Sequence, residues 1–112
     1  MTNYFTNVPS GDAQITVTQT DGTDVVLNGF LYINGEEDQR WTQSSFDQPI
    51  VLSVLSPKRY RIIVNAIFGT GSVTITVDVA GREKSTTLTG DADDNGEDFL
   101  DAQFAILTEL PA

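Results

Sequence analysis

The chain has 112 residues, which is enough for one ordinary domain and too few for two. Hydrophobic residues make up 39% of the sequence and charged residues 20%, which is a globular composition and not that of a disordered chain. The 16 acidic residues outnumber the 6 basic ones and give a net charge of -10, so the field of the molecule disfavours nucleic acid and anionic membrane surfaces as partners. We expect a single domain over residues 1–112.

The sequence contains neither His nor Cys, which excludes serine or cysteine triads, zinc held by imidazole or thiolate, and disulfide bonds. Carboxylates are abundant, but no pair lies in a recognisable apolar cleft, so we expect no enzymatic activity. No run approaches the roughly 20 apolar residues of a membrane span, and residues 1–5 lack the features of a classical signal peptide. The location therefore stays open between the cytoplasm and non-classical export.

The first half of the sequence predicts two strands and a long connection. Residues 14–20 alternate apolar and polar positions, and Asp21-Gly22 predicts a hairpin turn after them. Residues 24–33 are apolar on both faces, as in a central strand, and Gly29 marks a bulge or a close backbone approach. Asn34-Gly35 ends this strand. Residues 36–47 are polar without a period and predict a long surface connection.

The second half predicts strands over residues 50–55, 60–68, 72–79, 86–89 and 99–107. Gly69-Thr70-Gly71 is expected to separate the second of these from the third. Short strands with turn signals every 8 to 12 residues or so, and no helical period, are typical of an all-β fold. We therefore predict a single antiparallel β-sandwich of the Greek-key or jelly-roll kind with seven to eight strands, and an open barrel as the alternative.

An acidic segment near the C-terminus is the candidate metal site. Asp91-x-Asp93-x-Asn95-Gly96 reproduces the first half of a calcium-binding loop, and hard oxygen ligands in this number favour Ca²⁺ over Mg²⁺ and transition metals. Asp98 and Ala102 break the EF-hand pattern, so a generic calcium loop is expected. The candidate ligands are Asp91, Asp93, Asn95, Glu97, Asp98 and Asp101. The alternative is a solvated acidic turn without metal.

Two stretches of this region resemble a known family. Residues 71–81, Gly-Ser-Val-Thr-Ile-Thr-Val-Asp-Val-Ala-Gly, precede an acidic segment ending Glu-Asp-Phe-Leu-Asp-Ala at 97–102. Over residues 71–107 the chain resembles the small calcium-dependent fucose/mannose-binding bacterial lectins. The resemblance implies a β-sandwich in which calcium contacts sugar hydroxyls, with Asp98 and Asp101 matching two family aspartates and Asp21 standing where an early loop carries Asn. Leu100 replaces a family Asn ligand.

Two further groups suggest binding. Trp41 lies beside Gln39, Arg40 and Gln43, where an aromatic ring among amides and a guanidinium could stack on a sugar or a partner protein. The alternative for Trp41 is a lid over the edge of the sandwich. The basic group at residues 58–61 either grips an anion or pairs with neighbouring carboxylates.

Together these features predict a non-enzymatic, calcium-binding β-sandwich module that binds carbohydrate or a protein surface, with Trp41 and Asp21 as ligand contacts. The alternative is a structural or assembly protein, such as a virion, appendage or secretion component, that has no metal requirement. Exposed edge strands permit a homo-oligomer in either case.

Overall fold

The computed structural model describes residues 2–44, 46–55, 58–91 and 102–108, with the backbone alone for 20–24, 66, 68, 70, 90 and 91. In this part of the chain the regular elements are strands, with no helix, which confirms the all-β class. In chain order the strands are β1 (Thr2–Val8), β2 (Gly11–Ile33), β3 (Glu36–Gln43), β4 (Ile50–Val54), β5 (Arg59–Val79), β6 (Arg82–Asp91) and β7 (Ala102–Thr108).

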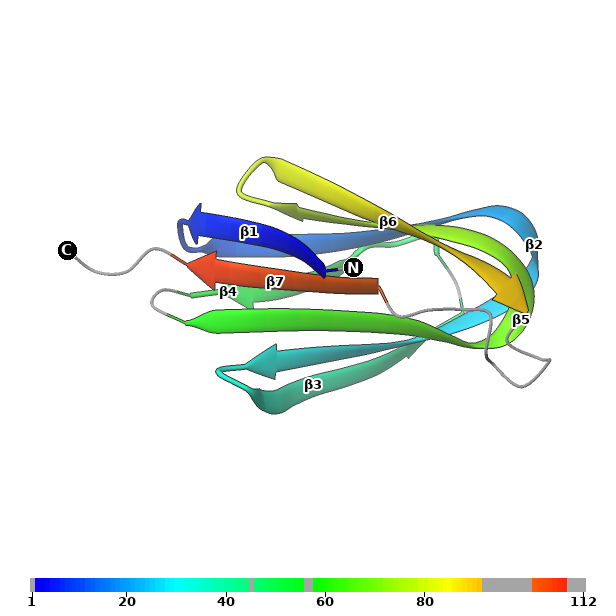
Figure 1. Ribbon diagram of the computed structural model, residues 1–112, viewed down its shortest axis with the longest axis horizontal. Helices are drawn as coiled ribbons and strands as arrows, with labels where there is room; N and C mark the ends of the chain where they lie inside the picture. Colours follow the sequence, from blue (N-terminus) through cyan, green and yellow to red (C-terminus); the bar gives the residue numbers. More distant parts are fainter. Residues whose placement is uncertain (1, 45, 56–57, 92–101, 109–112) are drawn as a thin grey trace.

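The two long strands, β2 and β5, pair antiparallel along most of their lengths, and the ribbon they form folds over near its middle (Figure 1). The N-terminal half of β2 and the C-terminal half of β5 lie between β4 and β6, forming a first layer. The other halves lie between β3 and β7, and β7 pairs with β1, forming a second layer. This arrangement of two sheets is compatible with a β-sandwich.

The bend in the ribbon of β2 and β5 lies where the sequence predicted turns. Asp21-Gly22 does not form a hairpin turn, because β2 continues through it and Gly22 pairs with Gly71 of β5. Likewise, the segment at 69–71 does not separate two strands, although Gly69 and Gly71 adopt φ of 95° and 135°. The register shifts of this pair fall between Gln19 and Leu27. The predicted turn residues thus act as bulges and kinks that bend a continuous ribbon.

The predicted long connection over residues 36–47 is also wrong, because most of it is strand β3. Asn34 and Gly35 have φ of 52° and 88°, the conformation that tight hairpin turns require, and they join β2 to β3 directly. The side chains of β3 are largely exposed, so the strand carries no apolar alternation. Its pairing with β2 comes from backbone hydrogen bonds, which leave no signal in a hydrophobic pattern.

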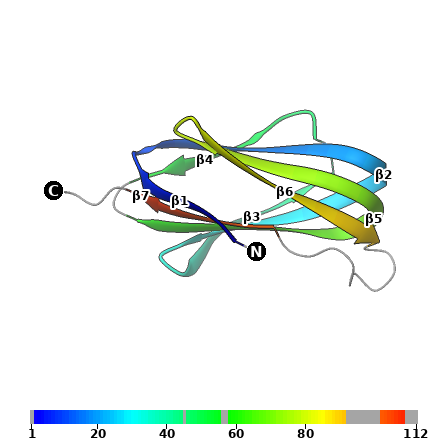
Figure 2. The ribbon, with the colours of Figure 1, turned by 45° about the horizontal axis from the view of Figure 1, so that its top comes forward.

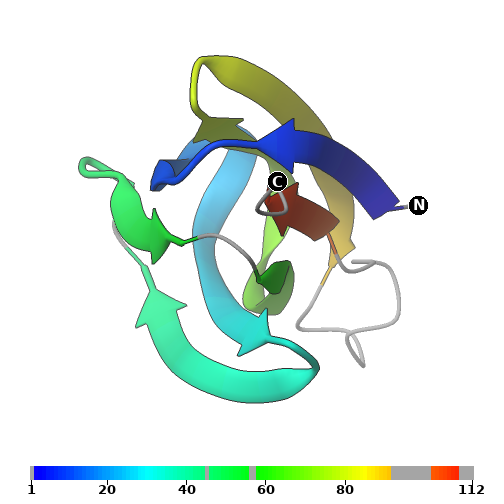
Figure 3. The ribbon, with the colours of Figure 1, turned by 90° about the vertical axis from the view of Figure 1, so that its left-hand side faces the viewer.

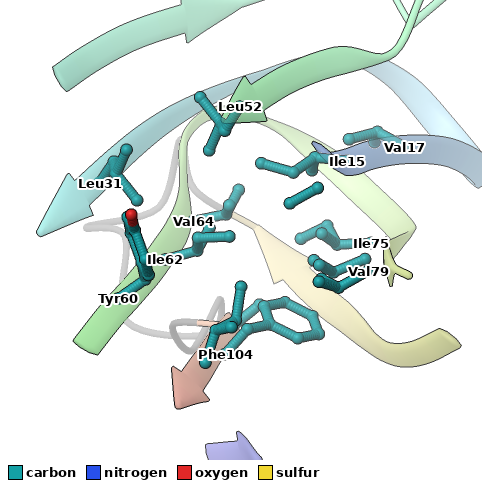
Figure 4. Close-up of a cluster of buried hydrophobic side chains, with 14 of the residues drawn as sticks. Ile15, Val17, Leu31, Leu52, Tyr60, Ile62, Val64, Ile75, Val79 and Phe104 are labelled. Atoms are coloured by element: carbon teal, nitrogen blue, oxygen red, sulfur yellow. The ribbon is translucent and has the colours of Figure 1, made fainter. Parts of the chain in front are cut away.

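The core lies between the two layers (Figure 4). The alternation predicted for residues 72–79 is confirmed, because Val73, Ile75, Val77 and Val79 are all 0% exposed. From the second layer, β5 contributes Ile62 and Val64, and β7 contributes Phe104. The predicted strand at 99–107 is seen from Ala102 to Thr108, and its first three residues lie outside the described part of the chain.

One pair of strands departs from the expected antiparallel arrangement. The N-terminal strand β1 pairs with β7 in parallel, at the edge of the second layer. From this edge β1 also contacts β6 of the first layer, where Asn3 Nδ2 donates to Thr86 Oγ1 at 2.6 Å and Arg82 donates to the Thr6 carbonyl. Figures 2 and 3 show β1 lying beside both β7 and β6. Strand β1 therefore closes one side of the sandwich.

Tyr60 joins the two layers at the end opposite the bend. Its side chain is buried at 3% exposure, and its hydroxyl accepts a hydrogen bond from the Leu55 N–H at 2.7 Å. The same hydroxyl donates to the Leu55 carbonyl at 3.1 Å. Leu55 follows β4 of the first layer, whereas Tyr60 belongs to β5 of the second layer. The hydroxyl thus fixes where β5 begins.

We expect Tyr60→Phe to destabilise the protein by about 1–2 kcal/mol, because the Leu55 N–H and carbonyl lose their shared partner. The thermal midpoint should fall by several degrees, as calorimetry can measure. Tyr4→Phe is the matched control, because the Tyr4 side chain is 57% exposed. Equal midpoints for the two variants would show that the Tyr60 hydroxyl does not stabilise this end of the sandwich.

Candidate functional site

The predicted calcium ligands lie mostly outside the described part of the chain. Residues 92–101 are not described, and Asp91 is seen only as the last backbone position of β6, paired with Thr70. Asp21 is seen as a backbone position paired with Ser72 in the bend. Among the described residues there is no group of three or more acidic side chains able to hold a metal ion. Calcium binding, and the role of Asp21, therefore stay predictions.

One described residue beside this region has an amide oxygen of the type that suits calcium. Asn65 Oδ1 is buried and has no hydrogen-bond partner within the described residues. Asn65 follows Val64, which pairs with Ala102, and the chain from the acidic segment enters β7 at Ala102. An unsatisfied amide oxygen is a hard ligand that fits Ca²⁺ better than a transition metal. No motif or pattern around Asn65 predicted a role for it.

Trp41 lies on strand β3 and not in a loop as predicted. It pairs with Gly29 of β2 and packs against the core with its side chain partly buried. A Cβ built on Gly29 would lie 2.0 Å from Trp41 Cε2, so the indole occupies the space that a side chain at position 29 would need. This confirms the close approach predicted at Gly29, and the packing matches the alternative in which Trp41 covers the edge of the sandwich. Ligand stacking on Trp41 is untested.

The outer face of the second layer carries a different group of aromatic and basic residues. Tyr32 on β2 pairs with Arg61 on β5, Arg61 pairs with Ala105 on β7, and Ala105 pairs with Tyr4 on β1. Cross-strand partners share a face of the sheet, so these four residues form one row across four strands. They line a hollow of about 490 Å³. The hollow is lined by Tyr4, Tyr32, Gly35, Arg59, Tyr60, Arg61, Ile63, Ala105 and Leu107.

The shape of this aromatic hollow follows from the sizes of its residues. Ala105 is the small member of the row, so the surface is low between Arg61 and Tyr4. Tyr4 and Tyr32 are three strand spacings apart, about 14 Å at the usual spacing of about 4.8 Å. Tyr4 is 57% exposed and Leu107 is 39% exposed, so much of the wall is apolar surface open to solvent. Such a surface on a rigid sheet suits a flat ligand.

A polar hollow of about 380 Å³ continues from the aromatic one and shares Arg59 and Leu107 with it. Its other lining residues are Thr6, Asn7, Asn34, Lys58 and Thr108. These residues lie where β5 begins and where β1, β2 and β7 end. This end of the ribbon is opposite the bend (Figure 1). The two hollows together offer an apolar floor with polar groups at one end, which is the usual composition of a ligand site.

The backbone that carries Lys58 and Arg59 is held from both sides. Asn34 Oδ1 accepts a hydrogen bond from the Arg59 N–H at 3.0 Å, and the Asn34 N–H donates to the Arg59 carbonyl at 2.8 Å. The buried Thr108 hydroxyl accepts from the Lys58 N–H and donates to the Lys58 carbonyl, both at 2.8 Å. These bonds fix the backbone from which the two cationic side chains extend.

The charges of this region are less compensated than the sequence suggested. Arg40 forms an ion pair with Glu37 at 3.0 Å and lies over the Phe30 ring. Lys58, Arg59 and Arg61 form no ion pair with a carboxylate within the described ranges, although Arg61 Nη1 donates to Gln103 Oε1 at 2.7 Å. The basic run was visible in the sequence. The position of this basic run beside Tyr4 and Ala105 depends on strand pairings, which no local sequence pattern predicts.

Comparisons with protein-family models, with curated proteins and with solved structures found no match. The described residues also include no helix long and apolar enough to cross a membrane.

We expect Gly29→Ala to displace the indole of Trp41, because the added Cβ would overlap its ring. Trp41 is the single tryptophan, so its fluorescence emission should shift to longer wavelength as the ring becomes more exposed. The thermal midpoint should fall as the packing is lost. Gly11→Ala is the matched control, since a Cβ there would meet nothing within 4 Å. An unchanged emission maximum in Gly29→Ala would contradict the packing of Trp41 on Gly29.

Proposed function

We propose that this protein is a non-enzymatic β-sandwich module that binds carbohydrate, and that the aromatic hollow of the second layer is its binding surface. The observation that carries this proposal is the row in which two outward-facing tyrosines stand on either side of Ala105. Aromatic faces stack on the apolar C–H faces of sugar rings, while hydroxyls and amides bind the sugar hydroxyls. The aromatic and polar hollows supply these two kinds of contact side by side.

The open shape of the surface favours a chain of sugars over a small apolar molecule. Small-molecule pockets enclose most of their ligand, whereas Tyr4 and Leu107 here are largely exposed. A sugar chain can lie along a sheet and contact separate aromatic rings, because each ring supplies one local stacking contact. The rigid strands hold the rings at a fixed separation without the entropic cost of ordering a loop.

The test is binding of the full chain to a panel of soluble polysaccharides, comprising dextran, galactan, mannan, xylan and polygalacturonate. We expect at least one to bind, and Tyr4→Ala and Tyr32→Ala each to weaken that binding about tenfold or more, which is about 1.4 kcal/mol. Val51→Ala is the matched control, because Val51 is an exposed apolar side chain, 52% exposed, on β4 of the first layer. Affinity electrophoresis or calorimetry measures the effect.

Two results would contradict the proposal. One is the absence of binding to every polysaccharide by a folded protein, checked by its thermal midpoint. The other is binding that Tyr4→Ala, Tyr32→Ala and Val51→Ala weaken equally, because this would place the ligand away from the aromatic hollow.

We also propose that the acidic segment 91–101 holds Ca²⁺, on the basis of its ligand pattern and the unsatisfied Asn65 amide beside the start of β7. Ca²⁺ at a hundredfold excess over its Kd should stabilise the native state by about 2.7 kcal/mol and raise the thermal midpoint by several degrees relative to EDTA. Mg²⁺ should have a smaller effect, and Asp98→Asn or Asp101→Asn should abolish the shift. Equal thermal midpoints in CaCl₂ and EDTA would contradict calcium binding and favour the alternative, a solvated acidic turn without metal.

An assembly role is the second candidate, favoured by one observation on the first layer. Strand β4 pairs with β2 on one side, and Val51 and Leu55 at this edge are 52% and 53% exposed. Exposed apolar edge strands can pair between subunits. A concentration-dependent oligomer that Val51→Lys dissociates, in a chain that binds no polysaccharide, would establish this role over the first.

A further inference from the structure

We infer that the ligand of the two hollows is an anionic polysaccharide whose sugars carry carboxylates, with Arg59 and Lys58 binding a carboxylate while Tyr32 and Tyr4 stack on sugar rings. This inference rests on the proposed carbohydrate binding and adds the charge of the ligand. It comes from the way the six basic residues are distributed over the molecule.

Three of the six basic side chains line neither hollow, and each has a partner in the structure. Arg40 pairs with Glu37. On β6, Arg82 donates to the Thr6 carbonyl and Lys84 lies 5.9 Å from the centre of the Phe5 ring, so both hold the seam between β6 and β1. These three cations are accounted for by the fold itself.

The other three cations lie together at the two hollows. Arg61 and Arg59 line the aromatic hollow, and Arg59 and Lys58 line the polar one. Within the residues that the structure describes, none of the three contacts a carboxylate. Arg61 donates one N–H to Gln103. A guanidinium has five N–H donors, so others remain for a ligand. In a chain with 16 acidic residues, three adjacent cations that have no acidic partner among the described residues indicate a site for an external anion.

The backbone that carries Lys58 and Arg59 has a defined position. Asn34 and Thr108 hold the Arg59 and Lys58 backbone through five hydrogen bonds of 2.8 to 3.3 Å. Binding therefore does not have to order the backbone from which these side chains extend, which lowers its entropic cost. A planar guanidinium accommodates a carboxylate with two parallel hydrogen bonds, which neutral sugar hydroxyls cannot accept in the same charge-assisted form.

The net charge of the molecule does not prevent an anion from approaching this end. The acidic segment joins the described strands at Asp91, which pairs with Thr70, and at Ala102, which pairs with Val64. These partners lie eleven and five residues along β5 from Arg59, which is about 36 Å and about 16 Å of strand, against a Debye length of about 8 Å in physiological salt. On the nearby hairpin, Glu37 is paired with Arg40, while Glu36 and Asp38 are exposed and screened by solvent.

The two tyrosines favour a sugar over an acidic peptide as the carrier of the carboxylate. Arg59 belongs to both hollows, so a carboxylate held there lies beside the wall formed by Tyr32 and Leu107. In a uronic acid the carboxylate is attached directly to a sugar ring with an apolar face. One sugar unit therefore supplies both the charge for Arg59 and the surface for a tyrosine.

The experiment compares polygalacturonate with its fully methyl-esterified form, in which the same sugar chain has no charge. We expect the full-length protein to bind polygalacturonate at least about tenfold more tightly, and Arg59→Gln and Lys58→Gln each to remove most of this preference. Lys84→Gln, which makes the same change of charge on β6, should leave it unchanged. Thermal midpoints establish that each variant is folded.

Binding to further ligands distinguishes a failure of this inference from a failure of the carbohydrate proposal. Equal binding of the charged and esterified chains, unaffected by Arg59→Gln, would overturn this inference and leave the carbohydrate proposal standing. Binding to neither, nor to any polysaccharide of the panel, would overturn both. Poly-glutamate bound as tightly as polygalacturonate would assign the cations to an acidic peptide, and dextran sulfate bound as tightly would overturn the carboxylate preference.

Discussion

The two-layer arrangement results from the bend in the paired ribbon of β2 and β5. Because these two strands remain paired on both sides of the bend, each contributes one half to the first layer and the other half to the second. The remaining strands add to the edges of this ribbon, β4 and β6 in one layer and β3, β7 and β1 in the other. The layers are therefore connected through backbone hydrogen bonds at the bend as well as through the core.

The same ribbon positions the surface that we propose binds sugar. The half of β5 that begins at Arg59 lies between Tyr32 of β2 and Ala105 of β7, so its outward basic side chains stand between aromatic residues that are distant in sequence. Strand β1 completes the row with Tyr4 by pairing with β7. At the start of β5, Tyr60 is hydrogen-bonded to Leu55, and Thr108 is hydrogen-bonded to Lys58. The same strands thus form both the core and the proposed binding surface.

The polar outer face of the first layer behaves differently. The hydroxyls of β5 and β6 pair with each other across the strands, Ser72 with Thr89, Thr74 with Thr87 and Thr76 with Ser85, at 2.8 to 2.9 Å. These groups satisfy one another, and the face presents no aromatic ring among them. The outer face of the second layer differs, because it carries aromatic rings and three cations that have no carboxylate partner among the described residues.

The all-β class and much of the core could be predicted from the sequence, because strict alternation such as that of Val73, Ile75, Val77 and Val79 is typical of a strand with one buried face. The sequence also marked Gly29, since a glycine within a strand indicates close approach of another group. It did not determine that Asp21-Gly22 and Gly69 to Gly71 would bend strands rather than end them, because the same residues suit a turn or a bulge and only their pairing with each other decides between the two. Nor did it reveal β3, which is held by backbone hydrogen bonds. The row of Tyr32, Arg61, Ala105 and Tyr4 was decided by tertiary structure alone, because residues on four strands become neighbours only through the register of those strands.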